Sequence, residues 1–439
     1  MTTMLLGRAK KVLLSYGIAT TLSLLFFFAL SPYSPNEIFS RPFNLPSVAF
    51  LSPHDRPIKS SPKSVDEVDI HLLIPLSDVP SLEPVSVRAE PAPYCRTVLT
   101  SLLRGYTPIL LDLGNQMTWE EGTSLKINVV ASYLERLAAA KSKKEQMVLM
   151  IDGWDVWMQL GPEELVRRYY DSNQGIILGA DKMCWPAPPD LPQACKDVPT
   201  SPFTAELYQS REASARGFTL PYTSEQKAIS QSPPRFPNSG TLLSTSTTLS
   251  SLYEHFVTHP ISPHPIAPGL ASVPPNDQER FVETFYTDHL SAQWRIATGF
   301  GLNVDYATEF FGTTLYALSD YVLNTGSAES TERWPVDEEK KEEEERQDKM
   351  SLEKAEIAHQ GLFSNRITGQ TPIAMHFNGK EGKEAAKIIW REMEWIQNRT
   401  VRETFEQKSG ATKGVWVGEV GGRWLEWDKL GCQGIWETI

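Results

Sequence analysis

The sequence is poor in cysteine and has no excess of basic residues. Its four cysteines are scattered over 439 residues, too few for a disulfide scaffold or a zinc knuckle, although Cys184 and Cys195 are close enough to bridge locally in an oxidising compartment. Lysine and arginine number 42 against 54 acidic residues, for a net charge of −12. Such a chain offers no basic surface to a phosphate backbone, so we expect no nucleic-acid partner. With 41% hydrophobic residues it is not wholly disordered and can build a real core.

Charge is missing altogether from residues 12–30, an apolar run about as long as a helix needs to cross a bilayer core. Arg8, Lys10 and Lys11 precede this run and are expected to stay in the cytoplasm. We therefore predict a single-pass type II protein of the Golgi or endoplasmic reticulum membrane, with its folded domain in the lumen. A cleaved signal peptide is the alternative. Asn398, in Asn-Arg-Thr, is an N-glycosylation acceptor that fits a lumenal location.

Shifts in composition divide the rest of the chain. A stem rich in proline and serine is predicted after the anchor, followed by one large domain that carries a charged insertion dominated by Glu and Lys. The aromatic tail is expected to close as a hairpin over the core. The predicted parts are a cytoplasmic tail (1–11), a transmembrane signal anchor (12–30), a stem (31–67), the main domain (68–400) with its charged insertion (337–358), and a C-terminal extension (401–439).

Strand-like and helix-like patterns alternate in the first half of the main domain, which predicts an α/β, Rossmann-like fold with a parallel sheet. The run from Met147 to Ile151 is apolar throughout, as expected of a strand buried on both faces. Residues 302–305 and 310–311 resemble two short strands or a hairpin. The other predicted elements are strands at 68–75, 107–113 and 175–180, helices at 94–104, 124–140 and 247–256, and a loop entering a strand at 235–243.

Two acids follow the buried strand, at Asp152 and Asp155. Ligands bind beyond the carboxyl ends of strands in open α/β sheets, and carboxylates at this spacing can converge on one cation. A turn with Asp as a helix cap is the alternative. His376 closes a later apolar strand and is a candidate third ligand as a neutral imidazole, or else a structural residue. Gly379 and Lys380 follow it, and Lys380 is a candidate phosphate contact.

Four further polar or aromatic residues are placed where a pocket would need them. Lys126, at the start of the predicted helix, would meet an anion there, and is otherwise a solvated lysine. Trp185 follows a strand and would wall a sugar or nucleotide pocket, or else belong to the core. Asn238 in Asn-Ser-Gly would offer an amide to sugar hydroxyls, or else form an ordinary turn. Asp277 begins a helix and would cap it or face the reacting sugar.

Seven short motifs in one order give the chain a family resemblance over roughly residues 110–382. They are Gly122-x3-Lys126, Asp152-Gly-Trp-Asp155, Cys184-Trp185-Pro186, Arg235-Phe-x-Asn238-Ser239-Gly240, Asp277-Gln278, Leu302-Asn303-x-Asp305 and Pro372-Ile-x2-His376-x-Asn378-Gly379. Together they resemble the glycosyltransferase domain shared by multifunctional procollagen lysyl hydroxylases and related collagen-type sugar transferases, including fungal relatives.

The resemblance implies a GT-A type fold in which Asp152, Asp155 and His376 hold Mn²⁺ on a UDP-sugar. It further implies that Trp154 packs on the uridine, that Lys126 lies near the nucleotide, and that Asn238, Asp277 and Trp185 surround the sugar. Where the family has an acidic cluster, this chain has Pro274-Pro275-Asn276, which leaves Asp277 as the candidate catalytic acid.

We accordingly predict a metal-dependent transferase that moves a hexose from a UDP-sugar to a hydroxyl of a protein or glycan acceptor. Two alternatives come from other functional classes. One is a catalytically silent relative that binds a nucleotide sugar or a glycan, which the altered acidic cluster permits. The other is an unrelated metal-dependent hydrolase that uses the same two aspartates and histidine. A different donor, such as GDP-mannose, is a variation within the first prediction.

Overall fold

The computed structural model describes the chain from residue 64 onward, with gaps. The described residues are 64–76, 92–113, 119–140, 142–172, 175–185, 194–209, 214–215, 218–219, 222–259, 264–265, 272–273, 276–293, 300–324, 361–393, 396, 398–408, 410, 413–418, 420, 422–432 and 434–436. They belong to one unit, Ser61–Ile439. The predicted cytoplasmic tail, the anchor at 12–30, nearly all of the stem and the charged insertion at 337–358 lie outside them. Within the described residues, no helix has the length and apolar character of a membrane span.

The first five elements follow the predicted alternation. They are β1 (Val68–Pro75), α3 (Tyr94–Leu103), β2 (Pro108–Leu111), α4 (Trp119–Ala139) and β3 (Glu145–Ile151). Strand β1 pairs in parallel with both β2 and β3, so this part of the sheet is parallel as expected. Helix α4 begins at Trp119, not at residue 124, which corrects the predicted loop before it. Two glutamates follow Trp119 in the sequence, and acids favour the first turn of a helix.

The complete sheet is mixed, which corrects the expectation of a parallel one. Its strand order is β11-β5-β8-β3-β1-β2-β16-β17. Strand β8 (Phe236–Thr245) lies antiparallel between β3 and β5 (Ile176–Asp181), and β11 (Leu302–Val304) pairs in parallel with β5. The register of β5 on β8 shifts between Leu178 and Gly179. Strand β8 continues through this irregularity, so Asn238 and Gly240 lie inside a strand where the sequence predicted a loop.

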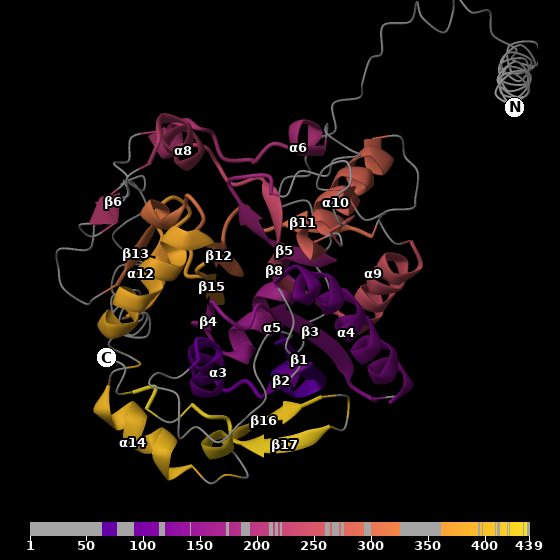
Figure 1. Ribbon diagram of the computed structural model, residues 1–439, viewed down its shortest axis with the longest axis vertical. Coiled ribbons are helices and arrows are strands. Elements are labelled where there is room, and N and C mark those ends of the chain that lie inside the picture. Colours follow the sequence, from indigo (N-terminus) through magenta and orange to yellow (C-terminus); the bar gives the residue numbers. More distant parts are fainter. Residues whose placement is uncertain are drawn as a thin grey trace, which may run out of the picture. The chain divides into compact units, whose positions relative to one another are not determined.

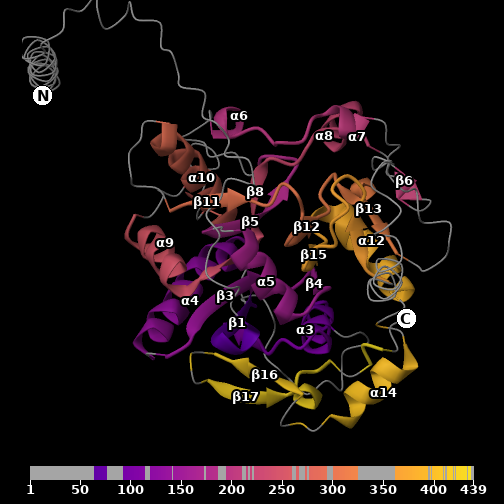
Figure 2. The ribbon, with the colours of Figure 1, turned by 180° about the vertical axis from the view of Figure 1, so that it is seen from behind.

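Helices cover both faces of the sheet, and β3 shows why (Figures 1 and 2). Met147, Leu149 and Ile151 pack with residues of α3 and of α5 (Pro162–Ser172), whereas Val148 and Met150 pack with α4 and α9 (Ser246–Thr258). Alternate residues of a strand face opposite sides, so a strand covered on both faces is apolar throughout. Strand β3, whose carboxyl end carries the two aspartates, is therefore an interior strand of the large sheet.

A second, smaller sheet joins the carboxyl end of β3 to the later part of the chain. Its order is β12-β15-β4, made of β12 (Phe311–Thr313), β15 (Ala374–His376) and β4 (Val156–Met158). Strand β15 runs antiparallel to β4 with His376 opposite Val156. Since β11 and β12 belong to different sheets, the predicted hairpin at 302–311 is wrong, and the alternative of two separate strands holds.

The C-terminal hairpin forms as expected from β16 (Gly414–Val417) and β17 (Arg423–Glu426). It does more than cover the core, because β16 pairs in parallel with β2 and extends the large sheet. Two disulfides link the described cysteines. Cys184–Cys195 is the local bridge allowed by the sequence, whereas Cys95–Cys432 spans 337 residues and was not predicted.

The remaining elements are shorter or peripheral. The longer ones are α10 (Asp277–Gln293), α12 (Gly379–Glu392) and α14 (Arg399–Gln407). The short ones are η2 (Val65–Glu67), α6 (Ala194–Asp197), α7 (Glu206–Gln209), β6 (Ser214–Ala215), β7 (Phe218–Thr219), α8 (Ser224–Ser230), β9 (His264–Pro265), β10 (Ser272–Val273), η3 (Leu318–Asp320), β13 (Tyr321–Leu323), β14 (Phe363–Asn365) and η6 (Trp427–Lys429).

Candidate functional site

The turn between β3 and β4 carries both predicted aspartates. Asp152 directly follows β3 and is half-buried, whereas Asp155 directly precedes β4 and is buried. A Cβ at Gly153 would collide with the side chains of Leu76 and Ile74, so only glycine lets this turn pack against the end of β1. The turn therefore places two carboxylates side by side beyond the carboxyl end of β3.

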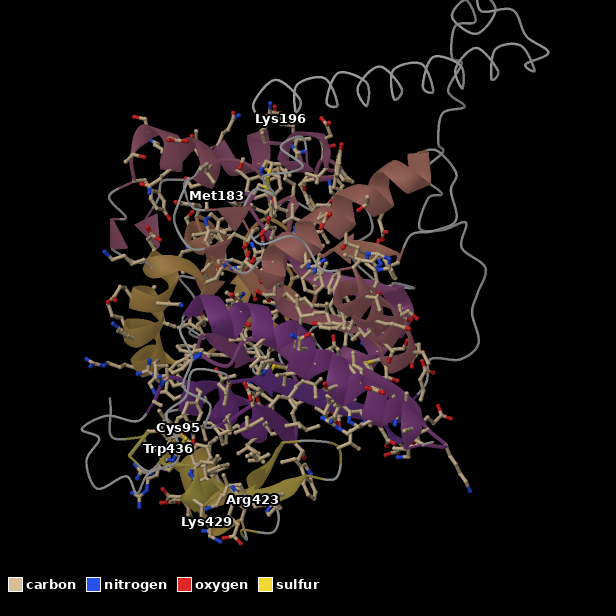
Figure 3. All side chains as sticks on the ribbon, turned by 45° about the vertical axis from the view of Figure 1, so that its right-hand side comes forward. Cys95, Met183, Lys196, Arg423, Lys429 and Trp436 are labelled. Carbon is tan, nitrogen blue, oxygen red and sulfur yellow. A yellow bond between two sulfur atoms is a disulfide. The ribbon has the colours of Figure 1, made fainter. Side chains whose placement is uncertain are left out.

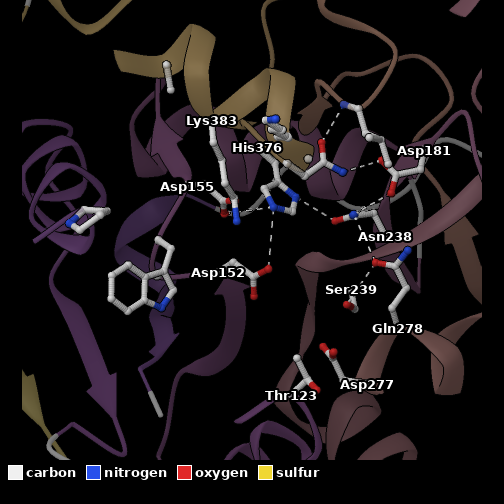
Figure 4. Close-up of a pocket in the computed structure, with 18 of the residues that line it drawn as sticks. Thr123, Asp152, Asp155, Asp181, Asn238, Ser239, Asp277, Gln278, His376 and Lys383 are labelled. Carbon is white, nitrogen blue, oxygen red and sulfur yellow. Dashed lines mark hydrogen bonds and ion pairs between the residues drawn. The ribbon is translucent and has the colours of Figure 1, made fainter. Parts of the chain in front are cut away.

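His376 meets these carboxylates from the end of β15. Its Nε2 lies 3.2 Å from Asp155 Oδ1 and 3.8 Å from Asp152 Oδ2 (Figure 4). One ligand atom from each of the three residues lies within 4.8 Å of the others. The geometry thus gathers the three predicted metal ligands, although His376 is separated from the aspartates by more than half of the sequence.

Gly240 makes this close approach possible. Its carbonyl oxygen accepts a hydrogen bond from the backbone N–H of Asp152 at 2.8 Å. A Cβ at position 240 would strike His376 Cε1 and come within 2.6 Å of Asp152 Oδ2. The glycine of the Asn-Ser-Gly motif therefore serves to bring a strand backbone against the histidine and the acid, rather than to form a turn.

Asn238 fixes the orientation of the histidine ring. Its Oδ1 accepts from the backbone N–H of Gly240 at 2.9 Å and lies 3.0 Å from His376 Nδ1, while its Nδ2 donates to Asp181 Oδ2 at 2.8 Å. With its oxygen held toward Gly240, Asn238 can only accept from Nδ1, so that nitrogen carries a proton and Nε2 faces the two aspartates. Metal-binding histidines are typically oriented by such a partner on the second nitrogen.

Asp181 ties this arrangement to the next strand. It is fully buried at the end of β5 and also accepts from Asn378 Nδ2 at 3.0 Å. Asn378 Oδ1 in turn accepts from the backbone N–H groups of Thr314 and Leu315. Asp181 and Asn378 were not predicted as site residues. The position of Asp181 at the end of a buried strand was a possible signal for it, and Asn378 belongs to the same motif as His376.

The carboxylates near His376 favour its protonated form. Burial acts to lower the pKa of His376, but Asp155 and then Asp152 outweigh it and raise the pKa above its ordinary value. Burial likewise opposes ionisation of Asp152, yet Lys126 and His376 lower the pKa of that carboxyl. A bound divalent cation would replace the proton between these groups. Two carboxylates and one oriented imidazole suit a metal such as Mn²⁺, so the residues fit the predicted ion.

Lys126 lies deeper than the sequence suggested. It is in the third turn of α4, not at its start, and is buried, with Nζ 2.6 Å from Asp152 Oδ1 and 2.8 Å from Asp277 Oδ2. Burial alone would lower the pKa of Lys126, but the two carboxylates raise it. The solvated alternative is therefore wrong. Lys126 lines the pocket, and its expected contact with an anionic ligand stays a prediction.

Asp277 is the first residue of α10, but Asn276 caps that helix. The Oδ1 of Asn276 accepts from the backbone N–H of Gln278 at 2.8 Å, while Asp277 is buried against Lys126. Gln278 donates from Nε2 to the backbone carbonyl of Trp185, which lines the pocket and is 44% exposed. Trp185 is thus a surface residue of the pocket, and its alternative as a core residue is wrong.

All of the residues predicted from the sequence as site residues line one pocket of about 910 Å³. Trp154 lines it beside the aspartates, and Gly379 and Lys380 line it at the N-terminus of α12. Gly379 has a φ of +75°, a conformation that favours glycine. Lys383 extends from the next turn to lie 3.3 Å from Asp155 Oδ2.

The pocket also contains cationic residues that sequence reasoning missed. Lys383 and Lys387 follow Lys380 at helical spacing on α12, a pattern that was visible in the sequence. Arg96, in the first turn of α3, gave no such signal. Asp305, by contrast, belongs to a matched motif but serves the fold, because its carboxylate accepts from the backbone N–H groups of Glu309, Phe310 and Phe311.

One segment of the chain matches a known protein family. Residues 112–193 match the family model of the PLOD GT domain. The predicted resemblance to the lysyl hydroxylase glycosyltransferase domain is thus confirmed for this segment. It contains Lys126, the two aspartates of the turn and Trp185, whereas Asn238, Asp277 and His376 lie beyond it.

Two solved structures that are similar to parts of this chain are glycosyltransferases. A glycosyltransferase involved in the glycosylation of the major capsid of PBCV-1 has 10% identity, covers 74% of this chain and 98% of that one, and gives a TM-score of 0.28. Mouse xyloside xylosyltransferase 1 has 13% identity, covers 56% of this chain and 87% of that one, and gives a TM-score of 0.27. No curated protein matches the chain.

Proposed function

We propose that this protein is a metal-dependent glycosyltransferase of the GT-A type that transfers a hexose from a UDP-sugar to a hydroxyl of a protein or glycan acceptor. The observation that carries the proposal is the convergence of Asp152, Asp155 and His376 on one face of a pocket of about 910 Å³. The family match of residues 112–193 supports the transferase class independently of that geometry.

Each side of the pocket has a chemical task in this proposal. Asp152, Asp155 and His376 Nε2 would hold a divalent cation, which when bound neutralises the diphosphate of the leaving nucleotide. The N-terminus of α12, with Lys380 and Lys383, offers further positive charge to the phosphates. Trp154 beside the acids is suited to pack on the base of the nucleotide.

The sugar is expected on the opposite side of the metal ligands from Trp154. Asn238, Asp277 and Trp185, which line the same pocket, are the residues that we expect around it. Lys126 pairs with Asp152 and with Asp277, so it links the metal ligands to the candidate catalytic acid. Asp277 is our candidate for contacting the reacting sugar or the acceptor hydroxyl.

A lumenal location in the Golgi or endoplasmic reticulum, behind the uncharged segment at 12–30, is part of the proposal. The two disulfides support it, because such bonds persist in the oxidising compartments of the secretory pathway.

The test is the thermal stability of the full chain with UDP, with Mn²⁺, with both and with neither. A ligand that binds only the folded protein raises the melting temperature, so a metal-bridged nucleotide site predicts the largest increase when UDP and Mn²⁺ are present together. An increase with GDP instead of UDP would keep the transferase and change the donor. No increase with any nucleotide would reject the proposal in favour of the hydrolase or of a silent relative that binds a glycan.

The silent-relative alternative is separated by a second measurement. Mn²⁺-dependent hydrolysis of UDP-sugars by the full chain is expected from the enzyme. Stabilisation by UDP and Mn²⁺ without turnover of any UDP-hexose, with or without acceptor sugars, would identify a binding protein instead.

A further inference from the structure

The first turn of α3 is both a wall of the pocket and the anchor point of the C-terminus. Pro93 and Arg96 line the pocket, while Cys95 between them is bonded to Cys432. Figure 3 shows Cys95 on the side of the molecule where the C-terminal residues Lys429 and Trp436 gather. A segment near the C-terminus is thus bonded to the helical turn that lines the proposed nucleotide site.

Tyr94 connects that segment to Trp154. Its hydroxyl donates to the backbone carbonyl of Leu430 at 2.7 Å, in a buried position. Its ring meets the ring of Trp154 edge-on, with centroids 6.4 Å apart and planes at 90°. Edge-to-face aromatic pairs have a preferred geometry, so the position of the tyrosine ring restricts that of the tryptophan.

Residues 430–432, which we name the C-terminal anchor, are themselves held firmly. Leu430 and Cys432 are fully buried, and the backbone N–H of Leu430 donates to the carbonyl of Trp427 at 3.0 Å. The anchor holds α3 at two neighbouring residues, through the disulfide at Cys95 and the hydrogen bond at Tyr94. Two attachments on adjacent residues restrain the rotation of the first helical turn as well as its position.

We propose that the C-terminal anchor is a working part of the nucleotide site and that Tyr94 is a positioning residue for Trp154. The inference rests on the proposed function, since it assigns Trp154 to the base of a nucleoside diphosphate. Tyr94 does not reach the nucleotide itself. It holds the indole ring in the orientation that stacks on the base, and the anchor holds Tyr94.

The test is a calorimetric titration of the full chain with UDP at saturating Mn²⁺. Tyr94→Phe keeps the ring and removes the hydroxyl that donates to Leu430. Loss of one such hydrogen bond is expected to raise the Kd for UDP about fivefold. Cys95→Ser combined with Cys432→Ser removes the other attachment and is expected to raise the Kd in the same direction.

Tyr169→Phe is the matched control. The hydroxyl of Tyr169 donates to the backbone carbonyl of Gly175 at 2.9 Å, and Tyr169 is a buried residue of α5 outside the pocket lining. Its removal is an equivalent deletion of a tyrosine-to-backbone hydrogen bond. The Kd for UDP should stay unchanged in this variant.

Two further readouts separate positioning of Trp154 from general loosening. Titration with Mn²⁺ alone should give the wild-type affinity in Tyr94→Phe, because the deleted hydroxyl donates to the backbone of Leu430, which is not one of the predicted metal ligands. In a Trp154→Ala background, Tyr94→Phe should add no further loss of UDP affinity.

The outcomes decide between the inference and the proposed function. An unchanged UDP affinity in Tyr94→Phe, an equal loss of Mn²⁺ affinity, or a full effect in the Trp154→Ala background would each overturn the role of Tyr94. Failure of the wild-type chain to bind UDP with Mn²⁺ would instead reject the proposed function, and this inference with it.

Discussion

The metal side and the α12 side of the pocket are built in opposite ways. On the metal side, Asp155, His376 and Asn238 are buried and joined by hydrogen bonds or ion pairs that leave each ring and amide one orientation. On the α12 side, Lys383 and Lys387 have side chains 57% and 61% exposed. The first is a rigid cluster drawn from several strands, and the second is a row of long side chains on one helix.

The difference indicates what each side does for a ligand. A metal ion needs donor atoms at set positions, and buried partners supply those positions before the ion arrives. Phosphate oxygens carry diffuse charge and accept lysines in many geometries, so exposed side chains suffice. We therefore expect substitutions on the metal side to abolish function and substitutions on the α12 side to weaken binding.

Asp155→Asn should have the largest effect. It removes one charge from the metal ligands while keeping the shape of the side chain. Because substitutions of partners behind metal ligands typically cost about 10- to 100-fold, loss of a ligand should reduce Mn²⁺-dependent turnover at least about 100-fold. Steady-state assays with a UDP-sugar and a Mn²⁺ titration give the measurement.

Asp171→Asn is the control for that substitution. Asp171 is an aspartate of α5 that pairs with Arg167 on the surface. Its variant should keep wild-type turnover. Unreduced turnover in a folded Asp155→Asn protein would remove Asp155 from the metal site.

Gly240→Ala tests the backbone on which the metal side depends. The added Cβ would meet His376 Cε1 and Asp152 Oδ2, so one or both ligands must move. A shift of this kind should weaken Mn²⁺ binding about 10- to 100-fold, similar to the loss of an orienting partner. Calorimetric titration with Mn²⁺ measures it.

Gly301→Ala and Gly369→Ala add the same methyl group where no atom of the described residues lies within 4 Å, but both glycines have positive φ. Their variants should therefore lose some stability yet bind Mn²⁺ normally. Wild-type Mn²⁺ affinity in Gly240→Ala would mean that the close approach seen at this position has no bearing on the metal.

Lys383→Ala should have a moderate effect, in line with the exposed side of the pocket. Removing one cation near the phosphates should raise the KM for the donor several-fold, and kcat should change little. Because the side chain is exposed, the difference from wild type should shrink at high salt. Lys429→Ala, which removes an exposed lysine outside the pocket, should leave KM unaltered. A large fall in kcat for Lys383→Ala would instead place this lysine with the rigid cluster.

The smallest effect is expected outside the pocket, at Glu164. Hydrogen bonds from Arg167, and then from Arg168, lower the pKa of Glu164 to about 2 from its ordinary value of 4.5. A lowered pKa means that the stabilisation is complete above about pH 4.5 and is lost as the pH falls toward 2. Since the carboxylate is partly exposed, Glu164→Gln should lower the free energy of unfolding by only about 1 kcal/mol at pH 7.

Urea unfolding of wild type and Glu164→Gln at pH 7 and near pH 2 checks this prediction. The two proteins should differ at pH 7 and converge at the lower pH. A difference that persists at low pH would show that packing of the side chain, rather than its charge, is responsible.

The strands of the large sheet were predictable where their burial dictates their composition. A strand covered on both faces must be apolar throughout, which made the run from Met147 to Ile151 visible and located the aspartates at its end. The antiparallel insertion of β8 was not predictable, because an apolar run carries no information on strand direction.

The polar partners show the same division. Asp152, Asp155 and His376 were candidates from their places at strand ends, but the link from Asp181 through Asn238 to the histidine depends on a register shift between β5 and β8. The start of α4 was also misplaced, because Gly122 lowers the local helix propensity and sequence patterns locate the ends of helices poorly.

By itself the sequence determined the alternation of strands and helices in the first half of the main domain and the two carboxylates that follow one buried strand, since each depends on neighbours within a few positions. Only the tertiary structure decided that His376 faces the aspartates, that Gly240 must lack a side chain, and that Cys95, next to Tyr94, bonds to Cys432. These contacts join residues far apart in the chain, and whether they form depends on how the sheets pack rather than on any local pattern.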